Sequence, residues 1–387
     1  MKKLIIIAAS AALVLGACSK SEITTPAEKV PVTFGTYLGK TKAVSATTFG
    51  DMTLATLQAS TNGFGVFGYY ADNSGNGTTE DIASAADPAK FTPNFMYNQK
   101  VSYPTNSKWE YSPIKYWPNE YSAANAKTEQ GIDKLSFTAY APHVATVGTE
   151  GITAISANDA TGSPTITFKV PADGAEQIDL LYATNFASTI NLTKSTITYA
   201  VPFTFAHALS KLSFKVQAVV DEVTPSSGTI DAATTITLNS ITLKAGSINE
   251  SGVLKLTDGT WSSQAAGTAD HAYTGIDQTV TTTLTAVQKS GTDISLYAVP
   301  GSIAAGNLQI EVVYTVETTD AALPGGKVTM VNDIYNVSAA AFVFEANKKN
   351  IINLLLGMTS LKMTVTNVDD WGDGNEITVD LPVNVAS

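Results

Sequence analysis

Few side chains of this 387-residue sequence could do chemistry, and their spacing argues against a catalytic centre. Ser112 and Lys115 match Ser-x-x-Lys, a pattern of serine nucleophiles, but no Ser-Asp-Asn or Lys-Thr-Gly partner accompanies them. The flanking aromatic residues and Pro113 place the pair in a strand and turn instead of at a helix start. No histidine has a metal-type partner at i+2 to i+4; the three are His143, His207 and His271. We therefore predict structural histidines and no enzyme.

Two acidic stretches could in principle hold a cation. Asp72, Ser74, Asn76 and Gly77 imitate a calcium loop, but its twelfth position is Ala83 instead of the bidentate glutamate that an EF-hand needs. A second group near the end of the sequence consists of Asp369, Asp370, Asp373 and Glu376. We interpret both as solvated turns, so the sequence predicts neither a metal nor another cofactor.

Cys18 is the residue with the clearest chemical role. Residues 1–3 are a basic start, and Leu4 to Gly16 form an apolar run that is too short to span a bilayer as a helix, which is typical of a secretory signal. The run ends Leu-Gly-Ala-Cys, the pattern of a bacterial lipobox, so the sequence predicts a signal peptide over 1–17 and lipidation of Cys18. The alternative is an ordinary signal peptide followed by a stray cysteine. Cys18 is the only cysteine, so no disulfide can form within one chain.

Composition and charge narrow the class of protein. Hydrophobic residues make up 44% and charged residues 15%, which suits a β-rich extracellular protein and argues against disorder. The formal net charge is −11, and loss of the leader leaves 21 lysines against 34 acidic residues, a balance of −13. An acidic chain without a basic cluster is a poor partner for nucleic acid. Since the sequence contains no arginine, bidentate capture of phosphate or carboxylate is unavailable.

The elements that must position these residues are strands. In 134–142, apolar Leu135, Phe137 and Ala139 alternate with polar or small neighbours, which predicts a strand with one buried face. Together with 108–118 this region carries six large aromatic rings, which predict an aromatic core: Trp109, Tyr111, Tyr116, Trp117, Phe137 and Tyr140. Prolines punctuate the region, because proline cannot donate to a sheet ladder.

The rest of the sequence continues the same pattern of short apolar runs between glycine and proline turns. The expected strands are 31–39, 63–70, 165–170, 179–184, 212–216, 236–243, 252–256, 294–299, 308–316, 341–345, 350–356, 361–366 and 377–383. Many short strands and almost no sustained helical period indicate β-sandwiches. We predict an all-β protein with a tether over 18–30 and two tandem β-sandwich domains, 31–195 and 196–387.

The aromatic region also carries a family pattern. Residues 109–118 read Trp-x-Tyr-x-Pro-x-Lys-Tyr-Trp-Pro, and 135–142 read Leu-x-Phe-x-Ala-Tyr-x-Pro. Both resemble the first domain of the fimbrillin family (Mfa-like or FimA-like) of Bacteroidales pilus and surface lipoproteins. Residues 201–212 resemble the opening of that family's second domain, and 361–383 resemble its C-terminal hairpin. The resemblance covers most of the sequence.

The resemblance implies a function and a partner. It implies transthyretin-like, Greek-key sandwiches in a subunit that is lipid-anchored at the outer membrane and polymerises with other pilus subunits in a fimbrium by donor-strand exchange. In that family a trypsin-like protease first removes the first strand; the resemblance therefore implies loss of strand 31–39 here, with the candidate cut between Lys42 and Ala43 and Lys40 as the other basic residue. Family members commonly carry arginine there, so a solvated strand end is the alternative. The C-terminal hairpin can supply strand pairing to a neighbour.

A second hypothesis is a monomeric surface lipoprotein that binds a glycan or a host or bacterial surface ligand. Trp109, Trp117 or Trp261, if exposed on a flat face, could stack on sugar rings. Burial of these rings would discriminate between the hypotheses, because a tryptophan in the core cannot hold a glycan. The sequence leaves open whether the chain is a shaft, tip or anchor subunit, which strand is the donor, and what any ligand is.

Overall fold

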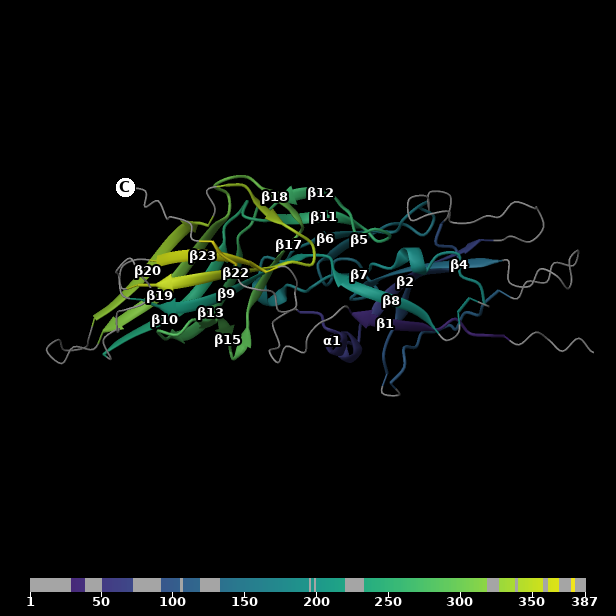
Figure 1. Cartoon of the computed structure of the whole chain (residues 1–387), viewed down its shortest axis with the longest axis horizontal. Helices are drawn as coiled ribbons and strands as arrows, with labels where there is room; N and C mark the ends of the chain where they lie inside the picture. Colours follow the sequence, from purple (N-terminus) through teal and green to yellow (C-terminus); the bar gives the residue numbers. More distant parts are fainter. Residues whose placement is uncertain are drawn as a thin grey trace, which may run out of the picture.

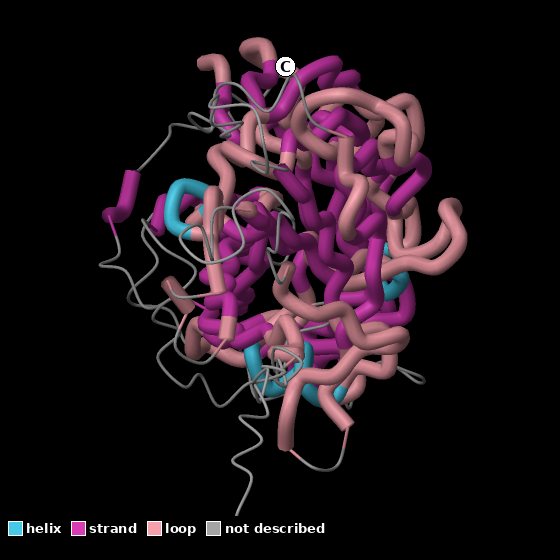
Figure 2. Tube along the Cα trace, turned by 90° about the vertical axis from the view of Figure 1, so that its right-hand side faces the viewer, coloured by secondary structure: helices cyan, strands magenta, loops and turns pink. Residues whose placement is uncertain are grey.

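The computed structural model describes residues 29–38, 51–71, 92–104, 107–118, 133–194, 196–197, 200–219, 233–318, 327–337, 340–357, 361–368 and 377–379. Within these ranges the elements lie side by side along an elongated body (Figure 1). Strands and loops make up nearly all of it, and helix is limited to a few short turns (Figure 2). The prediction of an all-β fold is confirmed.

A six-stranded sheet holds the first strand and most of the aromatic residues. Its strands, in order across the sheet, are β1 (Phe34–Leu38), β8 (Val201–His207), β7 (Leu181–Ala183), β4 (Lys134–Ala141), β2 (Phe64–Ala71) and β3 (Met96–Val101). Strand β1 runs parallel to β8, whereas the other neighbours are antiparallel. Since β1 is the last strand at its end of the order, β8 has only β7 and β1 beside it.

Three further sheets gather at the other end and along one side of the body (Figure 1). One has the order β13 (His271–Val280), β10 (Thr234–Leu243), β19 (Gln309–Thr318) and β20 (Lys327–Asn336). Another has the order β12 (Trp261–Ala266), β11 (Asn249–Lys255), β6 (Thr165–Lys169) and β5 (Ile152–Ile155). The third contains β14 (Thr285–Ala286), β9 (Ser210–Ala218), β22 (Lys349–Leu356), β23 (Leu361–Val368) and β24 (Ile377–Val379), with β17 (Ser295–Ala298) also on β9.

Small elements complete the described chain. Two-stranded pairs join β15 (Gln288–Lys289) to β16 (Thr292–Asp293) and β18 (Gly301–Ile303) to β21 (Phe342–Phe344). Two 3-10 turns, η2 (Gly174–Glu176) and η3 (Phe186–Ser188), flank β7. Helix α1 (Leu54–Ala59) opens with a capping box between Thr53 and Thr56. Helix α1 has no clear signal in the sequence, because it is only six residues long and buries a single side chain, Leu57.

Strand β4 corrects one expectation, because it is buried on both faces and not on one. Leu135, Phe137 and Ala139 join the aromatic core that β1, β2 and β8 share. From the opposite face, Tyr140 joins the larger core of the other sheets, and the hydroxyl of Thr138 donates to the carbonyl of Leu256 at 3.2 Å. The alternation correctly predicts a strand. Polar Ser136 and Thr138 suggested a solvent-exposed face, but other strands cover that face.

The predicted aromatic core exists, with two exceptions. Trp117 and Phe137 are buried in it, and Trp109 and Tyr111 pack against it from its rim, whereas Tyr140 is buried in the larger core on the opposite face of β4. Tyr116 was wrongly placed, because its side chain is 45% exposed. Residues 107–118 form only isolated bridges, to Pro31 before β1 and to Ser102 after β3, which fits the lack of donors at their prolines.

The sheets join residues on both sides of the boundary proposed at 195/196. Strand β8 follows that point but belongs to the sheet of β1, β2 and β4. Conversely, β6 precedes it and pairs with β11, which comes much later in the chain. The division into the domains 31–195 and 196–387 therefore stays a proposal.

Candidate functional site

The first strand, β1, is the edge strand of the six-stranded sheet and adds a row of mostly apolar side chains to the core. Along the segment that ends in β1, the side chains of Val32, Phe34 and Leu38 are buried, whereas Tyr37 is 54% exposed. Successive side chains of a strand point to opposite faces, so positions 32, 34, 36 and 38 form one inward row. We call the surroundings of this row the β1 seat.

Phe34 is the central contact of the β1 seat. Its ring stacks on Phe203 of β8 with 5.5 Å between centroids and a 19° interplanar angle. It also meets Phe137 of β4 edge-on at 5.5 Å and lies 5.5 Å from the ring of Tyr111. Aromatic pairs of this kind add stability beyond the area that they bury. Three separate segments therefore pack around one side chain of the first strand.

Backbone hydrogen bonds hold β1 to β8, and further bonds hold the residues just before β1 to the segment around 115–117. Strand β1 runs in register with β8, from Phe34 opposite Val201 to Leu38 opposite Phe205. Just before β1, the N–H of Val32 donates to the carbonyl of Lys115 at 2.9 Å, and the N–H of Trp117 donates to the carbonyl of Val30 at 2.9 Å. Loss of the strand and the residues just before it would leave an apolar groove and unpaired backbone groups on β8 and around 115–117.

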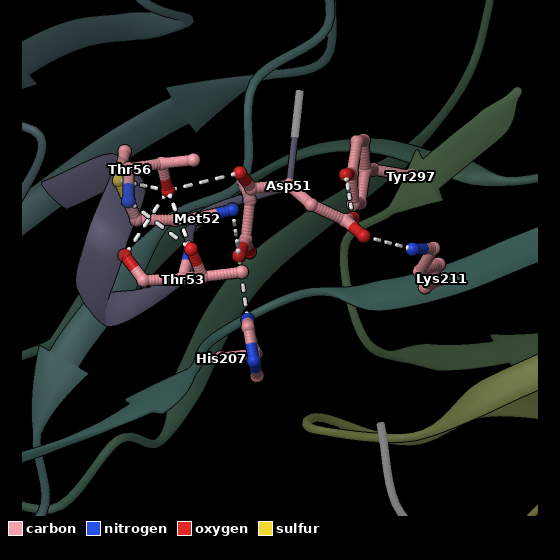
Figure 3. Close-up of polar contacts among 8 residues, drawn as sticks. Asp51, Met52, Thr53, Thr56, His207, Lys211 and Tyr297 are labelled. Carbon is pink, nitrogen blue, oxygen red and sulfur yellow. Dashed lines mark hydrogen bonds and ion pairs between the residues drawn. The ribbon is translucent and has the colours of Figure 1, made fainter. Parts of the chain in front are cut away.

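A partly buried polar cluster, which we call the Asp51 clamp, holds Asp51, the first described residue after β1; the Asp51 side chain is 22% exposed. The carboxylate of Asp51 forms an ion pair with Lys211 of β9 and accepts a hydrogen bond from the hydroxyl of Tyr297 of β17 at 2.6 Å (Figure 3). The side chain of Lys211 is only 6% exposed, so little solvent screens this pair. The clamp fixes the start of α1 to the sheet that contains β9.

A second buried pair lies next to the clamp. His207 Nδ1 lies 2.5 Å from Asp179 Oδ2, and the N–H of Met52 donates to the same oxygen at 3.3 Å. Burial raises the pKa of Asp179 to about 6, although the charge of His207 and its hydrogen bond pull the pKa back down. Met52 follows Asp51, so two adjacent residues tie the same short segment to three buried side chains, those of Lys211, Tyr297 and Asp179.

The raised pKa of Asp179 predicts a pH dependence of stability. Between pH 4 and pH 6 the carboxyl has lost its proton in the unfolded chain but keeps it in the folded chain, so folding binds a proton. This contribution to stability is therefore complete below pH 4 and is lost as the pH rises through 6. Asp179→Asn removes the ionisation and keeps an acceptor for both donors. From pH 4 to pH 7 we expect the wild type to lose up to about 3 kcal/mol relative to this variant.

The check is urea denaturation of both proteins at several pH values. Because every other titrating group is common to the two chains, the difference between their unfolding free energies isolates position 179 and its coupling to His207. A difference that stays flat, or that moves in favour of the wild type as the pH rises, would contradict the assignment.

The residues predicted to be modified lie outside the described residues. These are Cys18, Lys42 and Ala43, so lipidation and cleavage stay predictions, and the two acidic stretches lie outside as well. In the described part, Ser112 is exposed, and the Lys115 amine lies 6.0 Å from the ring centre of Phe95. In the same ranges, no group of three or more histidine, cysteine or acidic side chains is arranged to hold a metal.

The histidines and tryptophans have structural surroundings. His143, His207 and His271 are all buried, and His271 Nδ1 lies 3.0 Å from the carbonyl of Pro171. Trp117 is in the aromatic core and cannot present a face to a sugar. The ring of Trp109 is packed between Phe64 and Tyr103, and the indole N–H of Trp261 donates to the carbonyl of Ala208 at 2.9 Å. The surroundings of these three tryptophans therefore do not support the hypothesis that one of them stacks on a sugar ring.

The fold and the β1 seat define an all-β protein whose first strand completes the open end of a sheet. A family model described as fimbrillin-like matches residues 41–371. The chain belongs to the fimbrillin-like family, and the resemblance seen in its aromatic motifs is confirmed. Among the described residues, no helix has the length and apolar character needed to cross a membrane.

Two relatives are similar over nearly the whole chain. The fimbrium subunit Fim1C of Phocaeicola vulgatus is 27% identical over 401 residues, which cover 95% of this chain and 96% of that protein. The crystal structure of a fimbrial protein from Bacteroides vulgatus ATCC 8482 superposes with a TM-score of 0.63 at 24% identity. That superposition covers 88% of this chain and 98% of the other, and it supports the fold.

Proposed function

We propose that this chain is a structural or adhesive subunit of a fimbrium that polymerises by donor-strand exchange. The observation that supports this most directly is the β1 seat. Its occupant is a single strand at the end of a sheet, held by one row of side chains, by backbone pairing with β8, and by backbone bonds from the residues just before it. A segment from another subunit with the same alternation could take its place, which is the strand-addition mode of recognition.

The proposed cut between Lys42 and Ala43 suits this exchange. It lies after the end of β1 at Leu38 and before Asp51, where the clamp begins. Cleavage there would disconnect the strand from the body while the clamp keeps α1 in place. Lipidated Cys18 precedes the cut, so the same cleavage would separate the subunit from its outer-membrane anchor as it becomes able to assemble.

The C-terminal segment is the donor that we propose. Ile377, Val379, Leu381 and Val383 alternate with polar residues or proline and reproduce the four-position row of β1. Through β24 this segment begins at the edge of the sheet that contains β23. A second copy, or another subunit with such an end, is therefore the proposed partner.

Protease treatment tests the proposed function. Limited digestion of the chain from Ser19 onward with a lysine-specific protease is expected to remove residues 19–42 and to produce ladders on a non-boiled gel. The matched control carries Lys40→Gln and Lys42→Gln, so that the body and its other lysines are unchanged, and it should stay monomeric. Removal of residues 19–42 without any oligomer would count against donor-strand exchange.

A further inference from the structure

One position in the inward row of β1 is polar. Three of the four inward side chains, Val32, Phe34 and Leu38, are apolar and buried. The fourth is Thr36, whose hydroxyl oxygen is buried and has no hydrogen-bond partner among the residues that the structure describes. Thr36 lies opposite Phe203 in the register with β8, beside the ring on which Phe34 stacks.

A buried hydroxyl without a partner weakens the hold of its strand. The group gives up hydrogen bonds to water and gains none from the described residues, so an apolar group of the same shape would bind better. Valine has nearly the shape of threonine and an equally high propensity for β-strands. Strand propensity alone therefore gives no reason for a hydroxyl at position 36.

We propose that Thr36 is a built-in weak point that makes β1 replaceable, and that the incoming strand places an apolar side chain at this position. The inference rests on the proposed function, because it assigns Thr36 a role in strand exchange at the same seat. Aligned over all four positions, the row of the C-terminal segment brings Leu381 to the Thr36 position if it enters parallel to β1, and Val379 if it enters antiparallel. A second copy would thus remove the mismatch in either direction.

The test measures how tightly the nicked protein retains its first strand. The chain is expressed from Cys18 onward with a specific protease site inserted after Lys42, and it is labelled on Cys18, the only cysteine. After cleavage, fluorescence anisotropy follows the release of the labelled fragment from the body. The probe that competes for the seat is a synthetic peptide of residues 375–387.

Thr36→Val is expected to slow release of the fragment about tenfold, which corresponds to about 1.4 kcal/mol. Thr36→Ser, which keeps the hydroxyl and loses a methyl group, is expected to speed release. The thermal midpoint of each uncut chain provides a second readout that does not depend on cleavage, and valine should raise it by several degrees. Release from the valine variant that is as fast as from the wild type, or faster, would overturn the inference. If the fragment leaves neither protein, an unchanged or lower thermal midpoint of the valine variant would overturn it.

The competing peptide distinguishes a failure of this inference from a failure of the proposed function. Slower release from the valine variant with no effect of the peptide would retain Thr36 as the weak point of the first strand and reject the C-terminal segment as its replacement. Exchange with the peptide at the same rate in both proteins would support the donor strand and reject the role of Thr36.

Discussion

Phe34→Ala is expected to lower the free energy of unfolding of the uncut chain by about 3–5 kcal/mol, as is typical for truncation of a buried phenylalanine. The cavity would open between Phe203, Phe137 and Tyr111, which belong to three different segments. These residues cannot close the gap together, because each is fixed by its own strand or loop. Urea denaturation followed by tryptophan fluorescence measures the effect.

Tyr37→Ala is the matched control for this prediction. It removes an aromatic ring from another β1 residue, one that is 54% exposed, so its effect should stay within about 0.5 kcal/mol. In the nicked protein, Phe34→Ala should also release the first strand much faster than the control. A loss below 1 kcal/mol from Phe34→Ala would show that the aromatic core does not depend on the first strand, and the β1 seat would lose its place in the proposed function.

Local patterns in the sequence were sufficient to predict the strands. Alternation in 31–39 and 134–142 identified β1 and β4, because a strand places successive side chains on opposite faces whatever surrounds it. The same patterns could not show which faces are covered. The second face of β4 is covered by residues such as Leu256, which lies more than a hundred positions away in the sequence. No local sequence pattern can predict that contact.

The polar contacts of Asp51 and Asp179 could not be predicted from the sequence at all. Asp51 and Tyr297 are 246 positions apart, and Met52 and Asp179 are 127 positions apart. Each aspartate resembles a solvated loop residue until the chain is folded, since only packing removes the water around it. His207 was interpreted as structural, and the carboxylate partner that fixes its role emerged only from the folded chain.

The Asp51 clamp gives the other prediction with a large expected effect. Asp51→Ala is expected to lower the free energy of unfolding by about 3–5 kcal/mol, because it takes the carboxylate away from Lys211, whose side chain is almost fully buried. It also leaves the hydroxyl of Tyr297 without its acceptor at 2.6 Å. The measurement is urea denaturation at pH 7, with Asp159→Ala as the control, since Asp159 is an exposed loop carboxylate.

A double-mutant cycle separates the clamp from a general loss of charge. Tyr297→Phe removes only the hydroxyl, so its effect should be much smaller in the Asp51→Ala background than in the wild type. The nicked protein adds a second readout: with the clamp intact α1 should stay protected from hydrogen exchange after β1 has left, and with Asp51→Ala that protection should disappear. Additive effects and unchanged protection would mean that Asp51 does not hold the segment after the cut, and cleavage would then loosen α1 along with the first strand.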